Sequence, residues 1–215
     1  MIKYLKMKTI GIISYDCGNI TSLTNSISYL GYGFKLLEKK EELHKFHKII
    51  LPGVGAFDHA LDSLHKKNLF DPLKEWSSIK SNKLFGICLG MQLLCSGSEE
   101  SLKNNKGLNL IDANVLNLSS KVKIGHKIPH MGWNSINLSE NKIFSSENNN
   151  GDFYFVHSYA VFVNEKRASL SKTVYGDITF DSMITNGENI FGAQFHPEKS
   201  QHKGLKLLKE FIEYA

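Results

Sequence analysis

The sequence is poor in cysteine, which limits the kinds of scaffold and site that it can form. Its three cysteines, Cys17, Cys88 and Cys95, are an odd number, and no two of them have C-x-x-C spacing. A disulfide framework and a cysteine-based zinc site therefore do not fit, and we expect no metal. Unpaired thiols are typical of proteins from a reducing compartment, so the sequence favours a cytoplasmic location.

Long apolar runs and blocks of like charge are also missing. No apolar stretch approaches the ~18 residues of a membrane span, and residues 1–7 are too short and polar for a signal peptide, so we expect a short N-terminal extension there, with Met7 as an alternative start. The lysines are scattered despite a formal charge of +5, which is weak evidence for nucleic acid. We therefore expect neither a membrane nor a nucleic acid as partner.

What the sequence does contain is an alternation of strand-like and helix-like segments. Short apolar runs typical of buried strands occur at residues 9–14, 34–37, 48–51 and 84–87. Apolar residues at helical spacing occur in residues 20–30, 56–67, 71–79 and 89–95. This alternation predicts a parallel sheet with helices on both faces.

The second half of the chain has a different pattern. Residues 107–192 are mostly strand-like with many turns, and residues 153–163 are strongly β-prone. A further strand is expected at residues 190–195, before an amphipathic helix at residues 200–214. The predicted fold is a single α/β domain over residues 8–215, with a mostly parallel sheet flanked by helices and additional strands in the second half.

One segment has the form of a nucleophile elbow. Gly86-Ile87-Cys88-Leu89-Gly90 joins a predicted strand to a predicted helix, with cysteine in place of the more familiar serine. The glycines leave room for a sharp turn, and Cys88 would lie at the start of the helix, where free backbone N–H groups favour a thiolate. A buried structural cysteine is the alternative, and it is our interpretation of Cys17 and Cys95.

The second reactive segment is His196-Pro197-Glu198, which follows the strand expected at residues 190–195. His196 would lie at the carboxyl edge of the sheet, where α/β folds place their sites. Residues two apart in extended chain share one side, so Glu198 can reach the imidazole of His196 and hold its tautomer. Since a free thiol is only a few per cent ionised at neutral pH, such a base is what Cys88 needs. The pattern predicts a cysteine enzyme that needs no metal or cofactor.

These motifs resemble the class I (triad) glutamine amidotransferases, through residues 85–92 and 194–198. Residues 51–57 are similar to the oxyanion strand of that family. Residues 129–134 and 155–159 are similar to one branch of it, the glutaminase subunits that serve histidine biosynthesis. The resemblance runs from about residue 8 to the C-terminus, and it implies a flavodoxin-like sheet.

The resemblance implies that the chain hydrolyses glutamine to glutamate and ammonia. The ammonia would be channelled to a separate (β/α)8-barrel cyclase subunit, with which the chain would form a heterodimer. In this family pattern Cys88 attacks the side-chain amide, His196 moves the protons and Glu198 orients His196. Backbone groups would form the oxyanion hole, at Gly53, Val54 and Leu89.

The resemblance also implies residues that bind glutamine and the partner. The substrate contacts are assigned to Gln92, Glu100, Ser158 and Tyr159. The subunit interface is assigned to Asn19, Trp133, Tyr154 and Lys199. Simpler roles are open for some of these residues, because Trp133 could be a core side chain, Lys199 a solvated charge, and Glu99 could serve in place of Glu100.

Other functions remain open at this stage. A paralogous glutaminase could feed ammonia to a different synthase, such as a sugar-amidating enzyme. A free-standing hydrolase of γ-glutamyl compounds would have the same triad and would need no partner. A non-catalytic regulatory subunit would not need Cys88, His196 and Glu198 together.

Overall fold

The structure is a computed structural model, and it describes residues 8–123, 126–139 and 141–214. The N-terminal extension expected at residues 1–7 lies outside the described residues. The strands form one twelve-stranded mixed sheet, with the main order β2-β1-β3-β4-β12-β11-β10-β7-β8. Within the described part of the chain, no helix is long and apolar enough to span a bilayer.

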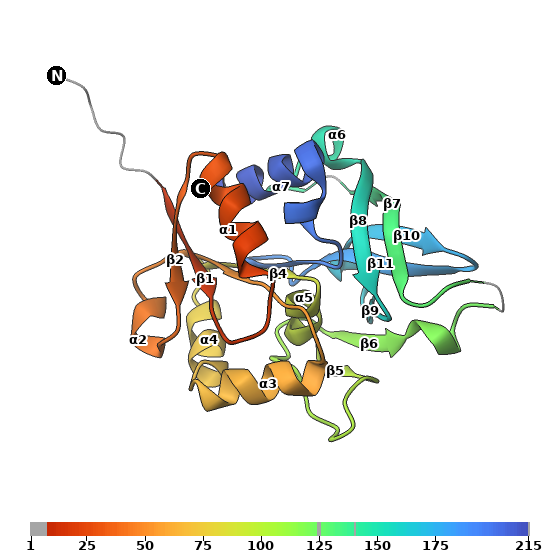
Figure 1. The fold of residues 1–215 in the computed structure, drawn as a ribbon, viewed down its shortest axis with the longest axis horizontal. Coiled ribbons are helices and arrows are strands. Elements are labelled where there is room, and N and C mark those ends of the chain that lie inside the picture. Colours follow the sequence, from red (N-terminus) through yellow and green to blue (C-terminus); the bar gives the residue numbers. More distant parts are fainter. Residues whose placement is uncertain (1–7, 124–125, 140, 215) are drawn as a thin grey trace.

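One half of the sheet is parallel, as the alternating sequence pattern predicted. Its strands are β2 (Gly33–Leu37), β1 (Thr9–Ile13), β3 (Lys48–Leu51), β4 (Lys83–Ile87) and β12 (Ile190–Ala193). The helices α1 (Ile20–Tyr29) and α7 (Gln201–Glu213) cover one face. The opposite face carries α3 (Phe57–Lys66), α4 (Phe70–Ser77) and α5 (Leu89–Leu94) (Figure 1).

Each strand of this half supplies side chains to two separate cores. Leu84 packs in the core under α3 and α4, while the next residue, Phe85, packs in the core under α1 and α7. Ile49 and Ile50 divide in the same way. Because successive side chains of a strand point to opposite faces, a continuous apolar run is what a sheet covered on both sides requires.

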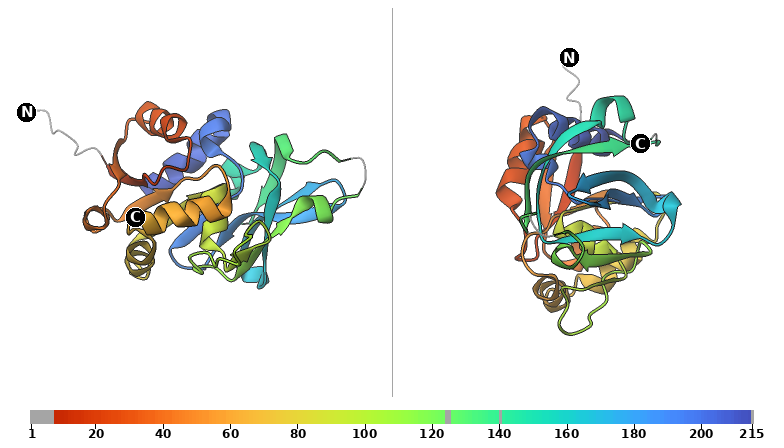
Figure 2. Two further views of the ribbon diagram at one scale, coloured as in Figure 1. Left: turned by 60° about the horizontal axis from the view of Figure 1, so that its bottom comes forward. Right: turned by 90° about the vertical axis from the view of Figure 1, so that its right-hand side faces the viewer.

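The additional strands predicted for the second half are present and pair antiparallel. Four of them continue the main sheet: β11 (Ile178–Thr185), β10 (Ser169–Tyr175), β7 (His130–Leu138) and β8 (Gly151–His157). A branch leaves the main sheet at β11 and consists of β9 (Tyr159–Val163), β6 (Ala113–Asn117) and β5 (Gly97–Ser98). The exception to the antiparallel pairing is the pair of β5 and β6, which is parallel. Figure 2 shows this strand-rich half, green to blue, extending away from the helical half. The remaining short elements are α2 (Lys40–Leu43), α6 (Ser146–Asn149), η1 (Leu118–Ser120), η2 (Lys166–Ala168) and η3 (Pro197–Lys199).

Some predicted boundaries differ from the structure. The β-prone segment 153–163 is two strands, β8 and β9, separated by Ser158. The strand expected at residues 190–195 ends at Ala193. The short helix α2 was not predicted, because its four residues are too few to show a periodicity; the Glu42 carboxylate stabilises its start by accepting the backbone N–H groups of Glu38 and Lys39.

The pairing of β4 with β12 brings the two predicted reactive segments together. The strands are parallel, with Gly86 opposite Gly192 and Ile87 opposite Ala193. The pairing continues one residue further, because the backbone N–H of Cys88 donates to the carbonyl of Ala193 at 2.7 Å. Both reactive segments therefore start from the carboxyl ends of neighbouring strands, where α/β folds place their sites.

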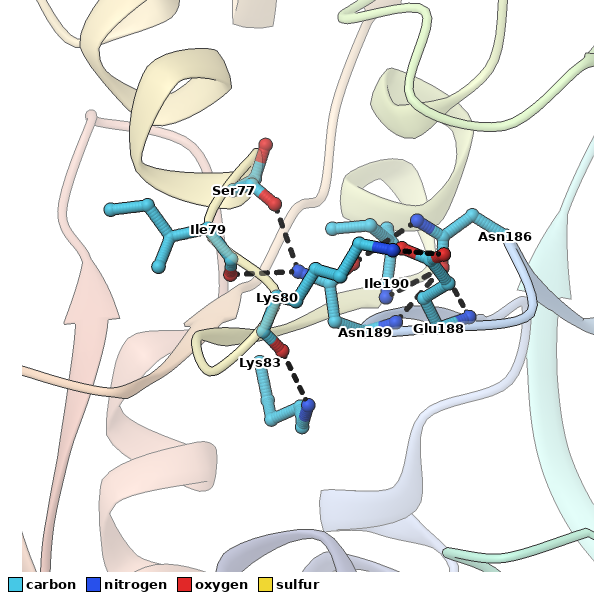
Figure 3. Close-up of polar contacts among 8 residues, drawn as sticks. All are labelled: Ser77, Ile79, Lys80, Lys83, Asn186, Glu188, Asn189 and Ile190. Atoms are coloured by element: carbon cyan, nitrogen blue, oxygen red, sulfur yellow. Dashed lines mark hydrogen bonds and ion pairs between the residues drawn. The ribbon is translucent and has the colours of Figure 1, made fainter.

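A buried asparagine holds the opposite end of this strand pair. Asn189 lies just before β12 and is 2% exposed. Its side-chain amide donates to the carbonyls of Ser77 and Ile79 at 2.8 and 3.2 Å (Figure 3). It also donates to the carbonyl of Asn82 at 2.9 Å, and so joins the β12 hairpin to the turn between α4 and β4. The carbonyl of Asn189 accepts the N–H of Leu84 at 3.0 Å, which fixes where β4 begins beside β12.

We expect Asn189→Ala to lower the free energy of unfolding by about 2–4 kcal/mol, because three carbonyls lose their donor in a buried turn. Urea denaturation measures this change. The matched control is Glu188→Ala, which removes only an exposed ion pair with Lys80 and should change stability by less than about 1 kcal/mol. Equal effects of the two substitutions would contradict the role given to Asn189.

Candidate active site

Cys88 occupies a strained turn between β4 and α5, as the elbow motif predicted. Its backbone has φ 53° and ψ −110°, a conformation that residues other than glycine rarely adopt. The side chain is 6% exposed. Such strain is kept only where the surrounding structure enforces it, and here the backbone bond from Cys88 to Ala193 does so.

The turn is held by close contact between backbones that only glycine permits. A side chain on Gly90 would place its Cβ 1.9 Å from the carbonyl oxygen of Leu51. A side chain on Gly53 would place its Cβ 2.6 Å from the backbone nitrogen of Gly90 and 2.8 Å from Cβ of Leu89. The segment after β3, with the predicted oxyanion residues Gly53 and Val54, therefore packs directly against the elbow.

His196 and Glu198 form a buried pair beside this turn. The Nδ1 atom of His196 and the Oε1 atom of Glu198 are 2.7 Å apart, and the two side chains are 2% and 4% exposed. The expected contact is present, but the extended backbone expected for it is wrong. Residues Pro197–Lys199 form a 3-10 turn instead, with Pro197 at its first position, and this turn folds Glu198 back toward the imidazole.

The charges around His196 keep it protonated. Burial alone would lower the pKa of His196, but the negative charge of the Cys88 thiolate, the interaction with that sulfur and the bond to Glu198 raise the pKa to about 10. The other ring nitrogen, Nε2, makes no hydrogen bond of ordinary geometry within the described part of the chain. Its proton is therefore available to a group that binds beside Cys88.

Cys88 and His196 border a cavity of about 360 Å³. Eight predicted site residues line it: Val54, Cys88, Leu89, Gln92, Glu100, Ser158, Tyr159 and His196. Gly53 and Glu198 do not, and instead border a much smaller cavity behind it, together with Asn19. The predicted substrate residues thus converge on one site, and Glu198 supports it from behind.

Two side chains give the cavity its polar character. The side-chain nitrogen of Gln92 donates to the carbonyl of Tyr159 at 3.0 Å and to Oε1 of Gln194 at 3.2 Å, so the carbonyl oxygen of Gln92 is left to accept a donor from a bound molecule. Burial raises the pKa of Glu100 above its ordinary value, and the negative charge of Asp58 raises it further. The hydrogen bond from the backbone N–H of Phe57 lowers this pKa, but it is outweighed. Glu99 is exposed and accepts from the N–H of Asn117, so Glu100 is the carboxylate that faces the cavity.

Sequence reasoning left His130 and His157 unassigned, and the structure joins them. They lie opposite each other on β7 and β8, both buried, with Nδ1 of His130 and Nε2 of His157 3.0 Å apart. The carbonyl of Tyr159 accepts from Nδ1 of His157 at 2.9 Å, and the Asn134 amide lies 3.2 Å from Nε2 of His130. Because a carbonyl only accepts and the amide nitrogen only donates, both rings must carry their proton on Nδ1.

Burial keeps these two rings neutral. Burial lowers the pKa of His130 to about 4. Burial also lowers the pKa of His157, and repulsion from His130 when that ring is protonated adds to the effect, which brings the pKa of His157 to about 3. His157 lines the cavity beside Pro129, Val156 and Gly55, three further residues that the sequence analysis did not single out. The one sequence signal that could have indicated that His157 lines the cavity is its position within the motif at residues 155–159.

Three of the four predicted interface residues form a surface cluster, in which Trp133 and Lys199 are exposed and Tyr154 is half-buried. Trp133 and Tyr154 are opposite each other on β7 and β8, with ring centroids 6.2 Å apart. The ammonium of Lys199 lies 5.8 Å from the centroid of the Tyr154 ring. Trp133 is 48% exposed, so it is not a core side chain. Asn19 borders the small cavity beside Glu198 and accepts the N–H of Ser22 at the start of α1, a helix that contacts η3.

The described residues contain no group of three or more histidine, cysteine, aspartate or glutamate side chains that could hold a metal ion. All three cysteines are free thiols. Cys88, His196 and Glu198 supply the cavity with a sulfur nucleophile, a protonated imidazole and a carboxylate behind it.

Comparison with known proteins identifies the family of the chain. The family described as "Glutamine amidotransferase class-I" matches residues 13–214. The chain is 44% identical over 206 residues to "Imidazole glycerol phosphate synthase subunit HisH" of Caldanaerobacter subterraneus, covering 95% of this chain and 97% of that protein. It is 41% identical over 204 residues to the subunit of the same name in Buchnera aphidicola, covering 94% and 97%.

Solved structures share the fold at low sequence identity. "Crystal structure of glutamine amidotransferase" has a TM-score of 0.71 at 20% identity, covering 95% of this chain and 97% of that chain. "Structure of PurLQS from Thermotoga maritima" has a TM-score of 0.72 at 16% identity, covering 97% and 99%. At these identities the likeness concerns the fold alone.

We expect ¹⁵N NMR at pH 7 to find His196 protonated on both ring nitrogens, and His130 and His157 neutral with the proton on Nδ1. His196 should lose its charge as the pH rises through about 10, because its pKa in the folded protein is raised. In Cys88→Ala the midpoint for His196 should fall, since the negative charge that holds the proton is gone. A neutral His196 in the wild type at pH 7 would contradict this account of the pair.

Proposed function

The chain belongs to the class I glutamine amidotransferases, and within them to the family of the HisH subunit of imidazole glycerol phosphate synthase, and from this premise we propose that it is the glutaminase subunit of that synthase. It would hydrolyse glutamine to glutamate and ammonia and pass the ammonia to a cyclase subunit for histidine biosynthesis. The observation that carries the proposal is the buried His196, which is bonded to Glu198 and lines the same cavity as Cys88. The proposal treats residues 8–215 as one domain.

In the proposed first step the Cys88 thiolate attacks the side-chain amide carbon of glutamine. The sulfur–carbon bond forms, the carbon–nitrogen bond breaks, and Nε2 of His196 gives its proton to the leaving nitrogen, which departs as ammonia. The neutral His196 then takes a proton from water as the water oxygen attacks the thioester. The sulfur–carbon bond breaks, glutamate leaves, and the thiolate and the imidazolium are restored.

The oxyanion of both steps would be bound by backbone groups. We assign this role to Gly53, Val54 and the N–H of Leu89, and the direct packing of Gly53 against Leu89 and Gly90 supports it. Val54 and Leu89 line the same cavity as Cys88. Loss of one such donor typically lowers the rate on the order of 10²–10³-fold.

Glutamine would be held at both of its ends. The free carbonyl oxygen of Gln92 suits the side-chain amide, and the carboxylate of Glu100 suits the α-ammonium group. Backbone groups of Ser158 and Tyr159, at the corner between β8 and β9, would receive the α-carboxylate. The support for these roles is that all four residues line the cavity that contains Cys88.

The partner would be a (β/α)8-barrel cyclase subunit in a heterodimer, docked on Trp133, Tyr154, Lys199 and Asn19. An aromatic pair at the surface with a cation over one ring is typical of an interface centre. Lys199 follows Glu198 directly, so a partner bound there would lie next to the catalytic turn. A channel into the partner is chemically reasonable, because ammonia released into neutral water becomes ammonium, which is no nucleophile. The proposal includes a cytoplasmic location, which three free thiols favour.

The experiment that tests the function is an assay of glutamate release from glutamine. It compares the purified chain alone, with the candidate cyclase, and with the cyclase and its nucleotide substrate. We expect little activity alone and a large rise when both are present. High activity without a partner would indicate an independent hydrolase, and stimulation only by a sugar-amidating synthase would indicate a paralogous glutaminase.

Cys88→Ala is the control for this assay. In complex with the cyclase it should release no glutamate but support synthesis when ammonia is supplied, because the cyclase subunit carries out the second reaction. The matched variant Cys95→Ala should keep both activities, since Cys95 is fully buried away from the cavity. Loss of both activities in a folded Cys88→Ala complex would contradict the division of labour.

The proposed interface leads to a separate prediction. Trp133→Ala should raise the dissociation constant for the cyclase roughly 30-fold, as expected for an aromatic residue near an interface centre. The matched control is Tyr29→Ala, which removes an exposed aromatic residue at the far end of α1. Calorimetric titration measures both. Equal affinities of the two variants would place the interface elsewhere.

A further inference from the structure

Gln194 accepts a hydrogen bond from Gln92, and it also touches the nucleophile. It follows β12 directly and is fully buried, and its backbone N–H donates to the carbonyl of Ser182 at 2.9 Å. Its side-chain nitrogen lies 3.8 Å from the sulfur of Cys88, within hydrogen-bonding distance for sulfur. A fully buried amide aimed at a reactive sulfur needs an explanation beyond packing, because a buried polar group is costly unless it is paired.

A backbone carbonyl determines which end of this amide faces the sulfur. The carbonyl of Tyr159 can only accept, so the side chain of Gln92 must turn its nitrogen toward it. That nitrogen has a second hydrogen, which is donated to Oε1 of Gln194 at 3.2 Å. The opposite orientation of Gln194 would bring two N–H donors face to face. The nitrogen of Gln194 is therefore the end that faces Cys88.

This orientation matters because a further neighbour of the sulfur, besides His196, favours the opposite charge state. The Cys88 sulfur lies 4.0 Å from the carbonyl oxygen of Val156, which can accept from a thiol but repels a thiolate. An N–H donor from Gln194 interacts with a thiolate more strongly than with a thiol, since hydrogen bonds to charged groups are about twice as strong. The balance between thiol and thiolate thus depends on the amide as well as on the charge of His196.

We propose that Gln194 is a further catalytic residue, whose side-chain amide donates a hydrogen bond to the Cys88 thiolate while its carbonyl oxygen fixes the orientation of Gln92. The donor stabilises the thiolate before attack and again when the sulfur leaves the thioester. The second effect is the larger one in turnover, because a better-stabilised thiolate is a better leaving group but a weaker nucleophile. The inference rests on the proposed glutaminase function.

The test uses the full chain with Gln194→Met, which keeps the length of the side chain and removes its donor and acceptor. The rate at which iodoacetamide alkylates Cys88 is followed against pH by peptide mass spectrometry, which separates Cys88 from Cys17 and Cys95. The thiolate displaces iodide, so the rate reports the thiolate. We expect the pH of half-maximal rate to move upward by about one unit, since a hydrogen bond to a charged group is worth about tenfold. The matched control, Thr185→Val, removes a buried hydrogen bond at the start of β12 and should leave that pH unchanged.

Turnover is measured in the complex with the cyclase. In Gln194→Met, kcat should fall about tenfold, and acid quenching at steady state should find a larger fraction of Cys88 as the γ-glutamyl thioester. An unchanged alkylation profile with an unchanged thioester fraction would overturn the proposal. The alkylation result does not require glutaminase activity, so a shifted profile in a chain that hydrolyses no glutamine would refute the proposed function and leave the Gln194–sulfur bond supported.

A wild-type measurement covers the case in which the variant does not fold. The side-chain amide protons of Gln194 should shift downfield in ¹H–¹⁵N NMR as the pH rises through the midpoint of Cys88 alkylation. Amide protons of Gln194 that do not respond to pH across that midpoint would overturn the proposal.

Discussion

The parallel pairing of β4 with β12 is the constraint on which the site depends. It joins two segments that are far apart in the chain, and its register places Ala193 opposite Ile87, with one further backbone bond to Cys88. The strain at Cys88 and the position of Gln194 and His196 all follow from that register. A slip of one residue would turn every side chain of β12 to the other face, and the Asn189 amide at the far end of the pair opposes such a slip.

The backbone carbonyl of Tyr159 sets the direction of two chains of hydrogen bonds in the site. The oxygen of Tyr159 accepts from both Gln92 and His157. Through Gln92 it sets the direction of the hydrogen bonds that lead to the Cys88 sulfur, and through His157 it sets those that lead along β7 to Asn134. In a buried site such chains are rigid because every reversal would leave two donors or two acceptors facing each other. The corner between β8 and β9 therefore organises the cavity that it also lines.

The sequence was sufficient for much of this structure. The covered parallel strands follow from apolar runs such as residues 48–51, and the elbow at Cys88 follows from its flanking glycines. It was not sufficient where contacts depend on strand register or side-chain direction. His130 and His157 meet because β7 and β8 pair with those two residues opposite each other, and no periodicity in either segment fixes that register. The same is true of Gln194, whose function depends on which end of its amide faces the sulfur, and of the 3-10 turn that brings Glu198 to His196.

The central claim is that Cys88, at the strained turn, forms the covalent bond with glutamine. The most direct test is to mix the complex with radiolabelled glutamine, quench in acid during turnover, and locate the label by peptide mapping. The account predicts a γ-glutamyl thioester on Cys88 and none on Cys17 or Cys95. Label on another residue, or glutamate formation in rapid-quench experiments with no labelled Cys88 at any time, would contradict it.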